Sequence, residues 1–142
     1  MTQNLTPKVR SVPLDDDIKT LATGRNFAAF TTLFPDGQPQ THVMWVDADD
    51  DHILINTEVH RAKFRNTERD PRVTVTIWDV DDAYRYAEVR GRVTDVVTGP
   101  AAREHIDACS QRYAGKPFPQ QGIESERAIL RITPEKIHRN GL

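Results

Sequence analysis

The sequence predicts a mainly β fold, a small closed antiparallel barrel of six or seven strands with short helices between the strand groups. Strands follow strands without the regular alternation with helices that a parallel sheet requires. Residues 72–79 (RVTVTIWD) alternate Val or Ile with Thr or Trp, which is the period of a half-buried strand. The long strand at 83–97 contains Gly91, and an internal glycine indicates a bulge or bend of the kind that a barrel corner needs.

Caps and turns delimit the predicted elements. Three aspartates after Leu14 suit the start of a helix, and Gly24 suits its end. The turn Pro35-Asp36-Gly37 joins two strands into a hairpin, because proline presets φ and glycine accepts a positive φ. Pro71 stops the second helix. The expected helices are 15–24, 60–69 and 100–113. The expected strands are 25–33, 38–46, 52–57, 72–79, 83–97 and 128–132, with a last extended stretch at 133–137.

The organisation along the chain is simple. Residues 1–142 are expected to form a single domain, because no linker or internal repeat divides them. Residues 1–13 are polar, contain two prolines and are expected to form a loose arm. The run DADDD at 47–51 is expected to be a solvated acidic turn. It lacks the glycine and the glutamate of a calcium-binding EF-hand loop, so no metal site is predicted there.

Composition excludes several classes of partner. The net charge is −2, so no global basic field collects nucleic acid, and no DNA or RNA partner is expected. Cys109 is the single cysteine, so no disulfide within the chain is possible, which fits a reducing cytoplasm. The N-terminus lacks the apolar core of a signal peptide, and no apolar run is long enough for a membrane span. We therefore expect a cytoplasmic protein without a membrane partner.

Only 37% of the residues are apolar, which is compatible with a core completed by a second subunit or a ligand.

The segment 53–73 carries the clearest chemical signal. A short apolar strand and a polar turn lead into a helix whose first turn carries Arg61, Lys63 and Arg65. Cations are unfavourable at a helix N-terminus, where the peptide dipoles already place partial positive charge. Basic side chains together with free backbone N–H groups bind phosphate. The pattern therefore predicts an anion site of the kind that holds a cofactor phosphate.

Several motifs occur in an order typical of one superfamily. They are Ala28-Ala29-Phe30-Thr31-Thr32 with Asp36-Gly37 and Pro39, Ile55-Asn56-Thr57, Arg61-Ala62-Lys63 with Asn66, Asp70-Pro71-Arg72-Val73, and Glu88-Val89-Arg90-Gly91-Arg92-Val93. From Leu14 to Ile137 this order resembles the split β-barrel flavin-binding superfamily, the pyridoxamine-phosphate-oxidase-like group, and within it the flavin/deazaflavin oxidoreductases. The resemblance implies an antiparallel split β-barrel of six to seven strands with short flanking helices.

The resemblance also implies a cofactor and its site. In such families basic residues that open the helix after the third strand hold the cofactor phosphate, and the ring system lies along barrel strands. The short Arg-Ala-Lys form looks more like users of the deazaflavin coenzyme F420 than like classical flavin oxidases, with FMN as the alternative cofactor. The superfamily is usually a homodimer with the cofactor between subunits. The cofactor-binding residues implied here are Arg61, Lys63, Arg65, Ile55, Asn56, Thr57, Thr41, Val43 and Met44.

The chain also departs from two related patterns. Pyridoxamine phosphate oxidase itself ends in an Arg-Leu-x-Pro substrate-binding tail, whereas residues 136–142 read KIHRNGL, so vitamin B6 oxidation is not expected. A haem-degrading activity, known for other split barrels, lacks a visible haem-ligand motif.

Catalytic candidates are few. His42 lies on a predicted strand and is a candidate contact to cofactor or substrate. Tyr84 and Tyr86 lie two apart and share a face of their strand, so either could wall a substrate pocket or simply pack. Trp45 and Trp78 read as core or interface aromatics. No Ser-His-Asp spacing, HExxH or GxGxxG motif is present.

The leading hypothesis is a deazaflavin-dependent reductase. Its reduced cofactor would pass a hydride to an electron-poor small molecule such as an enone, a quinone or a tetrapyrrole-like pigment, and Tyr84 or His42 is a candidate proton donor. The rival hypotheses are an FMN-binding oxidoreductase of the same fold and a carrier that binds either cofactor without turnover. Hydride transfer leaves no obligatory catalytic signature, so the residues alone do not separate an enzyme from a carrier.

Overall fold

The computed structural model describes residues 10–142, which build one seven-stranded antiparallel sheet with the strand order β2-β1-β5-β6-β7-β4-β3. The strands are β1 (Phe27–Leu33), β2 (Pro39–Trp45), β3 (Asp47–Ala48), β4 (Ile53–Glu58), β5 (Arg72–Asp79), β6 (Asp82–Thr98) and β7 (Arg127–Asn140). The helices are α1 (Asp16–Thr23), α2 (Ala62–Arg69) and α3 (Pro100–Ala114), with a short 3-10 turn at Gln120–Gly122. No helix in residues 10–142 is long and apolar enough to cross a lipid bilayer.

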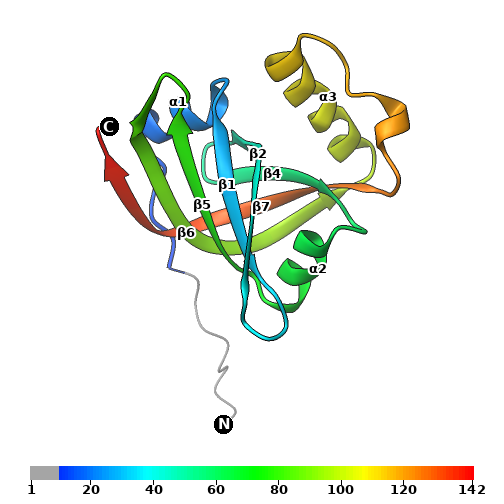
Figure 1. Cartoon of the computed structure of the whole chain (residues 1–142), viewed down its shortest axis with the longest axis horizontal. Helices are drawn as coiled ribbons and strands as arrows, with labels where there is room; N and C mark the ends of the chain where they lie inside the picture. Colours follow the sequence, from blue (N-terminus) through cyan, green and yellow to red (C-terminus); the bar gives the residue numbers. More distant parts are fainter. Residues whose placement is uncertain (1–9) are drawn as a thin grey trace.

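The sheet curls into a split barrel (Figure 1). The long strands β6 and β7 sweep across it, and β6 pairs with β5 on one side and with β7 on the other. The outer strands β2 and β3 are not paired with each other, so the ladder does not close. The predicted mainly β split barrel is therefore confirmed, whereas the fully closed barrel expected from the strand count does not form. The α3 helix covers β7, β6 and β4 near one end of the curl.

The core fills the inside of this curl. Alternate residues of β1, β5 and β6 point inward, including Phe30, Val75, Ile77 and Val89, each at most 1% exposed. The α1 helix closes the core with its buried face. It begins at the N-cap Asp15, whose side chain accepts a hydrogen bond from the Ile18 N–H at 3.1 Å. These ends agree with the predicted helix.

The predicted irregularity at Gly91 is present. The pairing of β6 with β7 shifts register between Arg90 and Gly91, as in a β-bulge, and Gly91 is buried opposite Pro134. A β-carbon on Gly91 would lie 2.2 Å from the Thr133 carbonyl oxygen, so the two strands approach too closely there for any side chain.

We expect Gly91→Ala to lower the free energy of unfolding by about 3 kcal/mol, because backbone must move to admit the methyl group. Chemical denaturation measures this loss. The control is Gly122→Ala, whose β-carbon would meet only the Phe118 ring at 3.4 Å, an ordinary contact. The control should change stability by no more than about 0.5 kcal/mol. Equal stability of the two variants would contradict the close approach.

The last strand differs from the prediction. The sequence predicts a strand at 128–132 and a separate extended stretch at 133–137, whereas in the structure the two form the single strand β7, which continues to Asn140. Pro134 is tolerated inside it because β4 pairs only with residues 127–132, so beyond that point one side of β7 is free of a partner strand. At its other end β7 begins at Arg127, one residue earlier than predicted.

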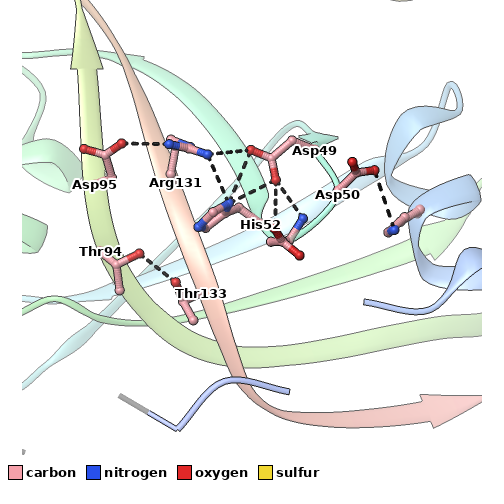
Figure 2. Close-up of polar contacts among 9 residues, drawn as sticks. Asp49, Asp50, His52, Thr94, Asp95, Arg131 and Thr133 are labelled. Atoms are coloured by element: carbon pink, nitrogen blue, oxygen red, sulfur yellow. Dashed lines mark hydrogen bonds and ion pairs between the residues drawn. The ribbon is translucent and has the colours of Figure 1, made fainter. Parts of the chain in front are cut away.

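The acidic segment also differs from the prediction in part. Asp47 and Ala48 form the short strand β3 against β4, and only the residues after them turn. Asp49 directs this turn by accepting hydrogen bonds from the N–H groups of Asp51 and His52 at 2.9 and 2.7 Å. Figure 2 shows how the turn is fastened to the sheet: Arg131 of β7 donates to Asp49 at 3.0 Å and to Asp95 of β6 at 2.9 Å. The Asp49 carboxylate is thus engaged in ion pairing and turn formation.

Of the arm predicted at residues 1–13, residues 1–9 lie outside the described part of the chain. The described remainder follows β7, since the Val12 N–H donates to the Pro134 carbonyl at 2.9 Å.

Candidate functional site

A cavity of about 330 Å³ opens where β1, β2, β4, α2 and α3 approach one another. It is lined by Phe27, Val43, Met44, Trp45, Thr57, Arg61, Lys63, Ile106, Phe118 and Arg127. One wall is apolar and largely aromatic, and the other carries three cationic side chains. Such a combination suits a ligand with a flat ring and an anionic group.

Two of the cations, Arg61 and Arg127, flank one buried carboxylate. Glu58, at the end of β4, has a side chain with no solvent exposure. Its Oε1 accepts hydrogen bonds from the backbone N–H groups of Glu124 and Ser125 at 2.7 and 2.9 Å. Its Oε2 lies 3.6 Å from a guanidinium nitrogen of both Arg61 and Arg127 and accepts no hydrogen bond. Burial raises the pKa of Glu58, but the two backbone N–H groups and Arg127 outweigh it and lower the pKa, so the carboxylate is charged.

Lys63 adds a third cation without an acidic partner. It lies in the first turn of α2, which begins at the N-cap Arg61, and its residue is 9% exposed. Among residues 10–142 no carboxylate lies within ion-pair distance of its ammonium. Burial lowers the pKa of Lys63, and the charges of Arg61 and Arg127 lower it further. The cavity wall therefore has an excess of positive charge, which an anion would relieve.

Arg127 is a site residue that the sequence interpretation missed. Antiparallel pairing of β4 with β7 places it directly opposite Glu58, across a sequence separation that local patterns do not reveal. Its Nε donates to Asn56 Oδ1 at 2.9 Å, and its guanidinium lies 5.2 Å from the centre of the Phe118 ring. Burial lowers the pKa of Arg127, and Arg61 and Arg103 act in the same direction.

Asn56, predicted as a cofactor contact, has a fully engaged side chain. Its Oδ1 accepts from Arg127, and its Nδ2 donates to the Ala102 carbonyl and to His105 Nδ1, both at 3.0 Å. Arg127 can only donate and the carbonyl can only accept, so these partners fix the orientation of the amide. The ring nitrogen Nδ1 of His105 must therefore accept a hydrogen bond.

His105 lies at the centre of a buried polar group under α3. Its Nε2 lies 2.9 Å from Asp47 Oδ2 and 3.6 Å from Cys109 Sγ. Burial lowers the pKa of His105, but Asp47 and Cys109 outweigh it and raise the pKa to about 9. The Asn56 amide acts to lower the pKa of His105. Its N–H points at Nδ1, which can accept a hydrogen bond only when the ring is neutral and carries its proton on Nε2.

The side chains of Asp47, His105 and Cys109 place possible metal-ligand atoms within 4.8 Å of one another. A metal on Nε2 would require Nδ1 to donate a hydrogen bond. The Asn56 amide offers it no acceptor, so the arrangement suits an Nε2–H···Asp47 hydrogen bond better than a metal.

The aromatic wall consists of Phe27 of β1, Trp45 of β2 and Phe118 of the loop after α3, and Tyr113 of α3 packs against Trp45. Tyr113 stacks on Trp45 with ring centres 5.0 Å apart and an interplanar angle of 4°. Phe118 meets Trp45 edge to face at 6.3 Å. The backbone of Phe118 is fastened to α3, since its N–H donates to Asp107 at 3.0 Å and its carbonyl accepts from Arg103 at 3.2 Å. Trp45, expected to be a packing residue, therefore also lines the cavity.

The structure gathers some of the predicted site residues and not others. Arg61, Lys63, Thr57, Val43 and Met44 line the cavity. His42 is exposed, and its pKa is lowered by partial burial and then by the charges of Lys63 and Arg61, so it lies beside the cationic wall.

The remaining candidates do not line the cavity. Ile55 is buried in the core, and the Thr41 hydroxyl pairs with that of Thr31 at 2.8 Å. Arg65 is exposed on α2. Tyr84 is 80% exposed near the start of β6.

Comparison with known proteins gives a consistent result. The family model described as pyridoxamine 5'-phosphate oxidase matches residues 14–141. The solved structure of an F420 reductase is 29% identical with a TM-score of 0.75, and the match covers 84% of this chain and 94% of that one. A conserved hypothetical protein from Mycobacterium tuberculosis is 24% identical, with a TM-score of 0.70 and coverage of 93% and 87%. General Stress Protein 26 from Bacillus anthracis is 20% identical, with a TM-score of 0.65 and coverage of 88% and 92%. The last two similarities concern the fold alone.

Proposed function

Because this chain belongs to the pyridoxamine 5'-phosphate oxidase family of split barrels, we propose that it is an oxidoreductase that uses the deazaflavin coenzyme F420. The observation that carries the proposal is the cavity with an aromatic wall and three cations, of which only Arg61 and Arg127 have a carboxylate, Glu58, within 4 Å. The similarity to an F420 reductase supports this choice of cofactor. FMN is the alternative, since it also joins a flat ring to a phosphate.

The residues of the cavity fit a cofactor of this kind. Lys63 is a nearly buried cation without an acidic partner, and Arg61 lies beside it at the N-cap of α2, so these two would hold the phosphate. Trp45, Phe118 and Met44 would pack against the ring and exclude water. When bound, a reduced deazaflavin supplies a hydride for an electron-poor acceptor. The part of the protein is to orient the two reactants and keep the site dry.

No charged acid or base is required for this chemistry. His42, a candidate proton donor from the sequence, lies near the cationic wall, and its lowered pKa favours the neutral ring, which is a poor proton donor at pH 7. Tyr84, the other candidate, is 80% exposed and does not line the cavity, so a water molecule is the simplest proton source for the product.

We further propose a cytoplasmic homodimer. Two apolar side chains at the cavity, Phe27 and Val43, are 36% and 65% exposed, and a second copy would cover them. Light scattering of the purified protein would test the oligomeric state.

The test of function separates an enzyme from a carrier. The protein is mixed under anaerobic conditions with reduced F420, and oxidation of the cofactor is followed by absorbance after addition of an enone, a quinone or a tetrapyrrole. Oxidation that is faster with the protein than without it supports a reductase. Binding of F420 without acceleration by any acceptor class would favour the carrier, and activity only with FMN would reassign the cofactor.

A further inference from the structure

We propose that Arg127 is a third anion-binding residue of the cavity and that Asn56 is the positioning residue that aims it. This inference rests on the proposed function insofar as the anion is a cofactor phosphate. It assigns to Asn56 an indirect role in place of the direct cofactor contact expected from the sequence.

One edge of the Arg127 guanidinium is unused among the described residues. Arg127 uses its Nε for Asn56, while its NH1 lies 3.6 Å from Glu58 Oε2, too far for a hydrogen bond. Among the described residues its two terminal nitrogens therefore donate no hydrogen bond, although the residue is only 9% exposed and lines the cavity. A guanidinium with an unused edge presents two parallel N–H groups, the geometry that binds phosphate or carboxylate oxygens.

The cationic wall carries more positive than negative charge. Glu58 is the one carboxylate, within residues 10–142, that lies within 4 Å of a cation of this wall, and it faces both Arg61 and Arg127. One negative charge thus serves three cations, counting Lys63. A bound ligand that supplies two negative charges would, together with Glu58, balance the three cations of the wall.

Two neighbouring side chains hold Arg127 in place. Phe118 lies over its guanidinium at 5.2 Å, and Asn56 accepts from its Nε. Asn56 is 8% exposed and is itself oriented by the Ala102 carbonyl and by His105. A buried amide that makes three hydrogen bonds is held in one orientation, so it fixes the direction of the guanidinium before any ligand arrives. The order of contact is therefore from α3 through Asn56 to Arg127 and the cavity.

The experiment is a double-mutant cycle with inorganic phosphate as the probe and FMN and F420 as larger ligands. Binding of phosphate is measured in every variant by isothermal titration calorimetry, and the Nε–Hε NMR signal of Arg127 reports the contact in the variants that retain this arginine. Arg127→Met should weaken binding about 10- to 100-fold, the loss of a charge-assisted contact. Asn56→Ala should weaken it about tenfold in the native background and have no further effect in the Arg127→Met background, because its action passes through Arg127. Arg90→Met, which removes an arginine paired with Glu88 on β6 outside the cavity, is the charge-matched control.

The outcomes separate this inference from the proposed function. Unchanged phosphate affinity in Arg127→Met would contradict the assignment of Arg127 as a third anion-binding residue. An effect of Asn56→Ala that persists in the Arg127→Met background overturns the positioning role. If Asn56→Ala does not fold, Arg127→Lys replaces it, since lysine keeps the charge but lacks the Nε–H that Asn56 accepts. It should lose most of the affinity that the guanidinium provides. Phosphate binding that depends on Arg127, with no binding of F420 or FMN, would support the anion site and contradict the proposed cofactor.

Discussion

Lys63→Met is expected to weaken binding of the phosphate-bearing cofactor by about 1.5–3 kcal/mol, or roughly 10- to 100-fold, and at the same time to stabilise the unliganded protein. The lowered pKa of Lys63 means that its charged form is disfavoured in the folded state, so at neutral pH the ammonium costs stability. Methionine fills similar space without the charge, and we expect the free energy of unfolding to rise by on the order of 1 kcal/mol. Fluorescence titration and chemical denaturation measure the two effects.

Lys136→Met is the matched control. Lys136 is exposed on β7 and does not line the cavity, so this change should leave both cofactor affinity and stability nearly unchanged. The opposite signs of the two effects are the decisive feature. A Lys63→Met variant that is less stable than the native protein, or that binds the cofactor equally well, would contradict the assignment of Lys63 as an anion-binding cation.

Glu58→Gln is expected to destabilise the unliganded protein by about 3 kcal/mol and to tighten phosphate binding. The carboxylate is the shared counterion of Arg61 and Arg127, and removal of one member of a buried ion pair leaves the others uncompensated. A bound phosphate supplies the missing negative charge, so the variant should gain more thermal stability from saturating phosphate or cofactor than the native protein does. Thermal unfolding with and without ligand measures this difference.

Glu126→Gln makes the same chemical change on an exposed neighbouring side chain, for which no ion pair is found among residues 10–142. This change should measurably alter neither the stability of the unliganded protein nor its affinity for phosphate. If Glu58→Gln weakens phosphate binding, Glu58 serves mainly to order the loop through the Glu124 and Ser125 N–H groups, and the charge argument fails.

Local patterns in the sequence predicted the frame of the site. The strand β4, the helix α2 and its basic first turn form one continuous segment, so Arg61 and Lys63 could be placed together from composition and dipole direction alone. The hairpin of β1 and β2 followed from Pro35-Asp36-Gly37, and the bulge followed from Gly91.

The missing parts of the site depend on contacts between distant segments. Arg127 lies 69 residues after Glu58 and reaches the cavity only because β4 pairs with β7 in that register. The aromatic wall depends on the packing of Tyr113 and Phe118 against Trp45. These residues are far apart in the sequence, so no local sequence pattern predicts their contact. The hydrogen bonds of the Asn56 side chain are also not predictable from local sequence, because its partners Ala102, His105 and Arg127 come from α3 and β7.

The most direct measurement is a titration of the purified protein with F420 and with FMN, followed by fluorescence and repeated with Lys63→Met. We expect tight binding of F420, weaker binding of FMN, and a loss of affinity of about 10- to 100-fold for either ligand in the variant. Binding of neither cofactor by the native protein, or equal affinities in the native protein and the variant, would contradict the claim that this cationic cavity holds a cofactor phosphate.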